Sequence, residues 1–161
     1  MSARSVAIAV VVVLMMVLHF TVRPILDWRA GIDFLTIAVL VVAVRSRPGI
    51  AAIVGFAVGL VADALSPEAF GAGALAMTVV GFTASRLKAA FFADNVMLNA
   101  VFVFLGKVAF DVILLVSERR LDGAALAVQL LVWTPLAALF TAFVGLLVMS
   151  VVRPTLERRR S

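Results

Sequence analysis

The sequence predicts an all-α integral membrane protein, and three properties of the chain indicate this. Hydrophobic residues make up 65 % of the 161 residues, while only 14 % are charged. Soluble chains have about 45–50 % apolar and about 25 % charged residues. The mean hydropathy is +1.21. A soluble domain of this size cannot bury so many apolar side chains, because small domains leave much of their surface exposed. These properties exclude a soluble globular protein and a disordered one.

Apolar runs separated by polar turns predict one polytopic membrane domain over residues 1–161, a bundle of six transmembrane helices. A helix needs about 20 apolar residues to cross the bilayer core. The first run resembles a signal peptide, but no small-residue cleavage site precedes Arg23, so we expect a retained helix. Ser66-Pro67-Glu68 supplies the N-cap and first turn of the fourth helix. The expected helices cover residues 6–22, 32–44, 48–65, 67–88, 95–117 and 124–152.

Two further features concern the ends of these helices. Residues 89–95, with two phenylalanines beside Asp94, are typical of an interfacial segment. The last helix is long for a single crossing, and Pro135 should kink it because proline removes a backbone hydrogen bond.

Basic residues predict the orientation, since they gather on the cytoplasmic side of membrane proteins. An even number of spans places both termini on one side. That side carries nine basic residues: Arg4, Arg45, Arg47, Arg86, Lys88, Arg153, Arg158, Arg159 and Arg160. The opposite loops carry four: Arg23, Arg29, Arg119 and Arg120. We therefore expect cytoplasmic termini and basic anchors that attract anionic lipids. The net charge of +5 then reports orientation and does not indicate nucleic acid.

Residues that could support catalysis are scarce. The chain has no cysteine, and His19 is its only histidine. It contains no Gly-rich phosphate loop, no HExxH and no GxSxG. We interpret His19 as an interfacial or hydrogen-bonded helix residue. The sequence therefore predicts no catalytic residue, no metal site and no cofactor.

Four charged residues fall inside the expected spans, where each costs roughly 2.5–3.5 kcal/mol on insertion scales and calls for a partner or a cavity. They form the candidate intramembrane polar cluster: Asp33, Asp63, Lys107 and Asp111. Lys107 and Asp111 share a helix face because they are four residues apart. Lys107 could also neutralise Asp33 or Asp63 if the bundle brings them close. Three interpretations stay open: a charge cluster that locks the helices, a ligand or proton site, and a docking point for a partner helix.

Glycines mark the expected helix contacts. Gly55, Gly59 and Asp63 follow one another at intervals of four, so they form one stripe on the third helix. Small residues let two helix backbones approach closely in a membrane. Gly81 thins the fourth helix in a similar way. We expect the tight contact to carry Asp63 into the bundle.

These residues resemble the bacterial rod shape-determining protein MreD family. Residues 55–65 read GFAVGLVADAL, followed by Pro67, Gly71 and Gly81-Phe82. Asp33 with its apolar run and the basic Arg45–Arg47 turn match the same pattern, and length and short loops agree over nearly the whole chain. The chain departs from the family at Ile32, where proline often precedes the acid.

The resemblance implies a non-enzymatic subunit of the cell-elongation machinery in the bacterial inner membrane. It implies binding to the bitopic protein MreC and, through it, a link to the actin-like MreB, the glycosyltransferase RodA and its transpeptidase partner. It also implies a fold similar to the S components of energy-coupling factor transporters. A small-molecule-binding transporter subunit therefore stays the alternative function. Assembly into homo-oligomers stays open as well.

Overall fold

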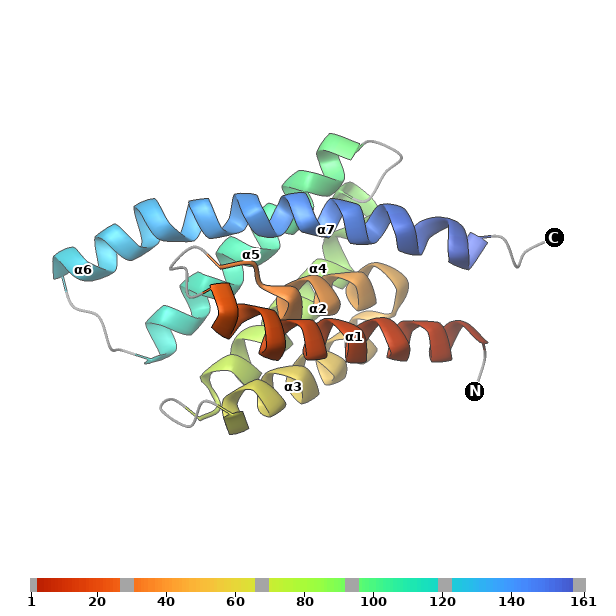
Figure 1. Cartoon of the computed structure of the whole chain (residues 1–161), viewed down its shortest axis with the longest axis horizontal. Helices are drawn as coiled ribbons and strands as arrows, with labels where there is room; N and C mark the ends of the chain where they lie inside the picture. Colours follow the sequence, from red (N-terminus) through yellow and green to blue (C-terminus); the bar gives the residue numbers. More distant parts are fainter. Residues whose placement is uncertain (1–2, 27–30, 66–69, 92–95, 119–122, 158–161) are drawn as a thin grey trace.

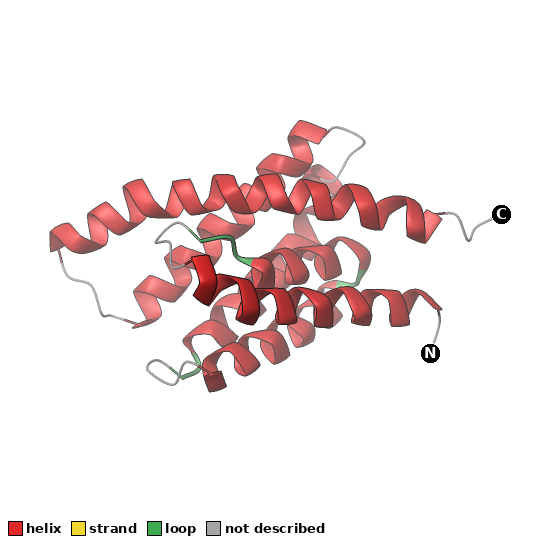
Figure 2. Ribbon diagram, viewed as in Figure 1, coloured by secondary structure: helices red, strands yellow, loops and turns green. Residues whose placement is uncertain are grey.

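The computed structural model of the chain describes residues 3–26, 31–65, 70–91, 96–118 and 123–157. Every element within these ranges is a helix (Figures 1 and 2). The helices are α1 (Ala3–Leu26), α2 (Phe34–Arg45), α3 (Pro48–Leu65), α4 (Ala72–Phe91) and α5 (Val96–Glu118). The last helix consists of α6 (Gly123–Val128), the π-helix η2 (Gln129–Trp133) and α7 (Thr134–Glu157).

The helices have the length and composition of a membrane protein. Within the described residues, three helices are long and apolar enough to cross a bilayer: Pro48–Leu65, Val96–Glu118 and Gly123–Ser150. Val6–Val22 and Phe34–Arg45 are shorter apolar helices. The start of α1 and the end of α7 lie at the same end of the bundle (Figure 1), as an even number of crossings requires. The all-α membrane architecture is confirmed, and six crossings stay a prediction.

The short helix α2 is the centre of the bundle. Its residues from Phe34 to Ala43 are all buried, and it packs against α1, α3, α4, α5 and α7. The side chains of Ile37 and Leu40 are fully enclosed. A helix that is apolar on every face lies in a protein core or in lipid. The burial of α2 on every side places it in the core of the bundle. Groups at the two ends of α2 are therefore held by neighbouring helices.

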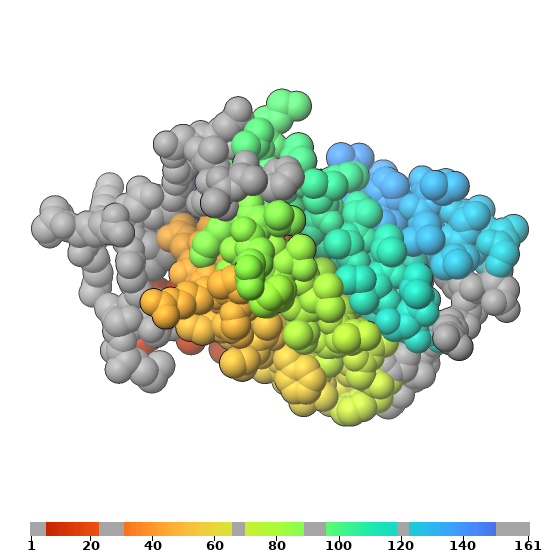
Figure 3. All heavy atoms as spheres, turned by 180° about the vertical axis from the view of Figure 1, so that it is seen from behind, coloured from red at the N-terminus to blue at the C-terminus, as the bar shows by residue number. Residues whose placement is uncertain are grey.

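The two helices α3 and α4 make the closest contact in the bundle, and glycines allow it. Gly55 lies against the backbone of Met77, and Gly59 lies against the backbone of Gly73 and Ala74. Gly81 of α4 packs against the Ala51 carbonyl and the Val39 side chain. The three glycines singled out in the sequence thus lie at contacts where a Cβ atom would meet another helix. Figure 3 shows the face on which α3, α4 and α5 lie side by side.

The fourth helix begins later than its sequence predicts. It starts at Ala72, because Gly71 has a φ of +99°, which no continuous α-helix accommodates. The expected cap at Ser66-Pro67-Glu68 falls on 66–69, outside the described residues. The helix extends to Phe91, so the first part of the segment expected at the interface is helical. The remainder, residues 92–95, lies outside the described ranges.

The last helix changes its hydrogen-bond pattern just before Pro135. In η2 the pattern is that of a π-helix, and the Thr134 N–H donates to the Gln129 carbonyl, five residues back. A π-bulge absorbs a local interruption of the helix without ending it. The structure thus has a π-helical turn where the sequence predicts a kink. Thr134 is the first residue after this turn, so the turn determines which way its side chain faces.

The contact between α3 and α4 generates the first testable prediction. In Gly59→Ala the added Cβ atom would approach the Gly73 carbonyl oxygen to 2.5 Å, so the two backbones must separate. Overpacking of this kind costs about 1–3 kcal/mol. We expect Gly59→Ala to lower the free energy of unfolding in detergent micelles. Gly49→Ala is the matched control, because nothing lies within 4 Å of its Cβ position. Equal stability of the two variants would contradict the contact.

Candidate functional site

Lys107 of α5 lies at the centre of a buried group of charges. Its Nζ donates to Asp33 Oδ2 at 2.9 Å and to Asp111 Oδ1 at 2.6 Å. Side-chain exposure is 8 % for Lys107 and Asp33 and 14 % for Asp111. Nζ also lies 4.9 Å from the centre of the Phe110 ring, close enough for a cation–π contact. We call Asp33, Lys107 and Asp111 the ion cluster.

Asp33 caps the N-terminus of α2, and this role holds its carboxylate in place beside Lys107. Its Oδ1 accepts hydrogen bonds from the backbone N–H groups of Leu35 and Thr36, both at 3.1 Å. Its Oδ2 accepts from the Thr36 hydroxyl at 2.9 Å in addition to Lys107. The backbone N–H of Asp33 donates to Thr141 Oγ1 of α7 at 3.1 Å. Asp33 therefore joins α2, α5 and α7.

Other polar side chains surround the ion cluster. His19 of α1 is buried, with Nδ1 3.7 Å from Asp33 Oδ1. The Thr134 hydroxyl lies beside the Asp111 carboxylate, although no hydrogen bond of good geometry joins it to a partner. Our sequence reasoning missed Thr36, Thr134 and Thr141. Of these three, only Thr36 could be found from the local sequence. It stands three residues after Asp33, the position whose side chain bonds back to the N-cap residue in a capping box.

Asp63 makes its hydrogen bonds elsewhere. The carboxylate, near the C-terminus of α3, accepts from the backbone N–H groups of Gly71 and Ala74 at 2.9 Å and of Gly73 at 3.1 Å. These groups lie at the start of α4, where N–H groups lack partners within the helix and the helix dipole favours an anion. Asp63 is thus stabilised without a cation, and it locks α3 to α4.

The basic residues expected at the cytoplasmic surface differ in their contacts. Lys88 Nζ donates to the Ser46 carbonyl at 2.6 Å, so it joins the end of α4 to the turn after α2. The Arg86 guanidinium lies 5.1 Å from the centre of the Phe82 ring, and its side chain is exposed. Arg45 is partly buried, whereas Arg47 is exposed. Arg158, Arg159 and Arg160 lie outside the described residues.

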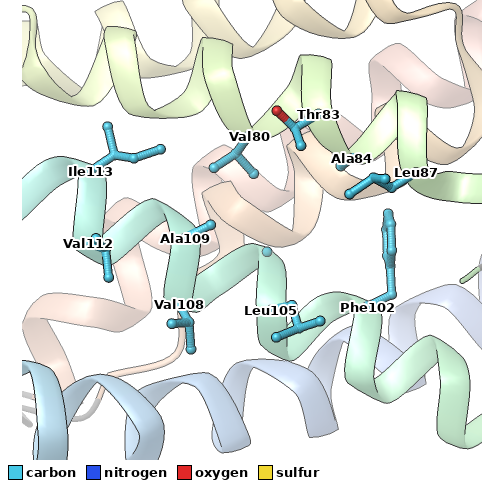
Figure 4. Close-up of a pocket in the computed structure, with 11 residues that line it drawn as sticks. Val80, Thr83, Ala84, Leu87, Phe102, Leu105, Val108, Ala109, Val112 and Ile113 are labelled. Carbon is cyan, nitrogen blue, oxygen red and sulfur yellow. The ribbon is translucent and has the colours of Figure 1, made fainter.

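An apolar cavity of about 490 Å³ lies between α4 and α5 (Figure 4). Its wall includes Val80, Leu87, Phe102 and Ile113, and Thr83 is the one residue with a polar side chain among those that line it. No ionisable side chain lines it. In the part of the chain that the structure describes, no three metal-ligating side chains lie together. The cavity can therefore hold an apolar group, and it offers only the Thr83 hydroxyl to a polar ligand.

These observations define an all-α membrane protein whose buried charges bond to one another or to helix ends. The family model of the rod shape-determining protein MreD matches residues 2–153. The chain therefore belongs to the MreD family, as its sequence pattern predicts, and it has a role in determining the rod shape of cells. No curated protein and no solved structure matches the chain.

The hydroxyl that holds Asp33 provides the second testable prediction. Thr36→Val removes a fully buried O–H donor to a carboxylate while keeping the shape of the side chain. Hydrogen bonds to charged groups contribute about 1.5–3 kcal/mol, so we expect the free energy of unfolding to fall by this amount. Thr83→Val is the matched control, since Thr83 is exposed on α4. Chemical denaturation of both variants in the same detergent checks this, and a Thr36→Val variant as stable as Thr83→Val would contradict the assignment.

Proposed function

We propose that this chain is a non-enzymatic scaffold subunit of the bacterial cell-elongation complex, the rod complex. It binds MreC in the inner membrane, helps to maintain cell shape and organises lateral peptidoglycan synthesis. Through MreC it is linked to MreB, to RodA and to the transpeptidase partner of RodA. Membership of the MreD family supports this proposal, because the family acts in rod-shape determination.

The observation that carries the scaffold proposal is the way the buried charges are used. Lys107 bonds to Asp33 and Asp111, and Asp63 bonds to the start of α4. Both sets of contacts hold helices against one another. A scaffold that holds partner proteins in place needs a rigid arrangement of helices. These ion pairs and hydrogen bonds keep the helices together, because separating them would leave an unpaired charge in lipid. This use of the charges supports a structural role.

The alternative is a small-molecule-binding subunit similar to a transporter S component. Ligand sites usually combine an apolar wall with several convergent polar groups that orient the ligand. The cavity between α4 and α5 has only the Thr83 hydroxyl as a polar group. A vitamin would find no charged partner in this cavity. The lining therefore favours the scaffold over the transporter subunit.

The proposed orientation places both termini in the cytoplasm. The basic residues of the turn after α2 and of the end of α4 then face the anionic inner leaflet, which attracts them by about 1 kcal/mol each. Lys88 supports the tight turn there through its bond to the Ser46 carbonyl. Arg47 and Arg86 are exposed and are available to lipid head groups. The opposite loops are left to contact extracytoplasmic parts of the complex.

Co-purification from the native membrane tests the proposal. The tagged full-length chain is extracted in a mild detergent, and its partners are identified by mass spectrometry of proteins and of small molecules. A scaffold should recover MreC in a stoichiometric amount. An unrelated polytopic membrane protein with the same tag and expression level is the control. A bound small molecule together with an ATPase module, and no MreC, would establish the alternative.

A further inference from the structure

The two carboxylates that share Lys107 have different surroundings. Asp33 accepts hydrogen bonds from two backbone N–H groups and one hydroxyl besides Lys107. These donors all favour its ionised form. Asp111 accepts a hydrogen bond from Lys107, and its side chain is the most exposed of the three, at 14 %. When two neighbouring acids differ in this way, the less supported one is the one that takes up a proton.

The ion cluster also has an unbalanced charge. Two carboxylates and one ammonium leave one negative charge when His19 is neutral. An uncompensated charge in low-dielectric surroundings is strongly unfavourable. One proton bound to the ion cluster removes this charge while the bond between Lys107 and Asp33 is kept. The charge imbalance therefore favours the uptake of one proton.

The Thr134 hydroxyl supplies a partner for that proton. It is 1 % exposed, it lies beside the Asp111 carboxylate, and no hydrogen bond of good geometry satisfies it. A hydroxyl can donate to a carboxylate and can accept from a protonated carboxyl group. Asp111 thus finds a partner in either protonation state. The π-helix η2 ends directly before Thr134 and fixes its place, and π-bulges often occur at functional sites.

Few other titratable groups face the ion cluster. His19 of α1 approaches Asp33, at 3.7 Å between Nδ1 and Oδ1. Glu118 lies two turns beyond Asp111 on the same helix. The described side chains of α7, α6 and η2 include no ionisable residue, and those of α4 are Arg86 and Lys88, near the end that contacts Ser46. A proton taken up by the cluster therefore binds either to Asp111 or to His19.

We propose that Asp111 is a proton-binding site inside the membrane domain. A proton from water at the membrane surface adds to the Asp111 carboxylate, the resulting O–H donates to Thr134 Oγ1, and the Lys107 ammonium stays bonded to Asp33. No other covalent bond forms or breaks, and the total charge of the ion cluster becomes zero. The ion pair between Lys107 and Asp111 within α5 is lost, and the new bond to Thr134 joins α5 to the start of α7. The site is independent of whether MreC binds.

Infrared difference spectroscopy on the full chain in lipid nanodiscs, titrated with acid and base, tests the site. Protonated carboxyl groups have a C=O stretching band that ionised ones lack. We expect one buried carboxyl band that titrates reversibly within the pH range in which the protein stays folded. Asp111→Asn should abolish that band. Glu118→Gln, the matched acid on the same helix, should keep it. If Asp111→Asn does not fold, Asp111→Glu serves instead and should shift the frequency of the band.

Three results would overturn the proposal. The first is a wild-type spectrum without a titrating buried carboxyl band across the whole folded range. The second is an unchanged band in Asp111→Asn, or an unshifted one in Asp111→Glu. The third is a titration that appears in imidazole modes and disappears in His19→Gln, which would assign the proton to His19.

Discussion

The arrangement of the bundle depends on the Lys107 ammonium being held between two carboxylates. A charge in the middle of an apolar helix must have partners, and the partners come from α2 and from the next turn of α5. Asp33 extends the connection to α7 through Thr141. Lipid gives helices no hydrophobic reason to associate, so such polar contacts and close packing decide which helices meet. The ion cluster therefore fixes the start of the central helix α2 in the bundle.

The contact between α3 and α4 also contains a buried charge, the Asp63 carboxylate, but backbone N–H groups stabilise it in place of a cation. Asp63 uses the free N–H groups at the start of α4, and the glycines of both helices bring the backbones close enough for this. Gly73 leaves room for the Asp63 carboxylate, because a side chain at this position would overlap it. Gly81 then brings α4 against Val39 of α2. Asp33 thus holds α2 directly, whereas Asp63 holds together α3 and α4, which both pack against α2.

The sequence predicts the local parts of this arrangement well. The pairing of Lys107 with Asp111 follows from their spacing of four, and the glycine contacts follow from small residues at intervals of four. Contacts between distant segments are not contained in such patterns. No local pattern indicates that Lys107 bonds to Asp33. Nor does one indicate that Asp63 bonds to Gly71 and to the first residues of α4. The sequence predicts the depth of a charged residue in the membrane, but not its lateral position in the bundle. The candidate intramembrane polar cluster therefore included Asp63, which lies outside the ion cluster in the structure.

The helix ends show the same limit. A good capping motif at Ser66-Pro67-Glu68 suggested an early start for the fourth helix, but the positive φ of Gly71 delays it to Ala72. Pro135 predicted a disturbance of the last helix, while its form, a π-helix ending at Trp133, depends on the packing around it. Thr134 became a candidate functional residue only once this register was known.

A double-mutant cycle between Asp33 and Lys107 tests the central claim most directly. Asparagine at position 33 keeps the capping of α2, since it is as good an N-cap as aspartate. It removes the charge and replaces the oxygen that accepts from Thr36 and Lys107 with an amide nitrogen. Methionine at position 107 removes the ammonium and leaves an apolar side chain. Because breaking a buried pair costs about 3–5 kcal/mol, the free energies of unfolding should deviate from additivity by more than about 1.5 kcal/mol. Additive effects, within about 0.5 kcal/mol, would show that the bundle does not depend on this ion pair.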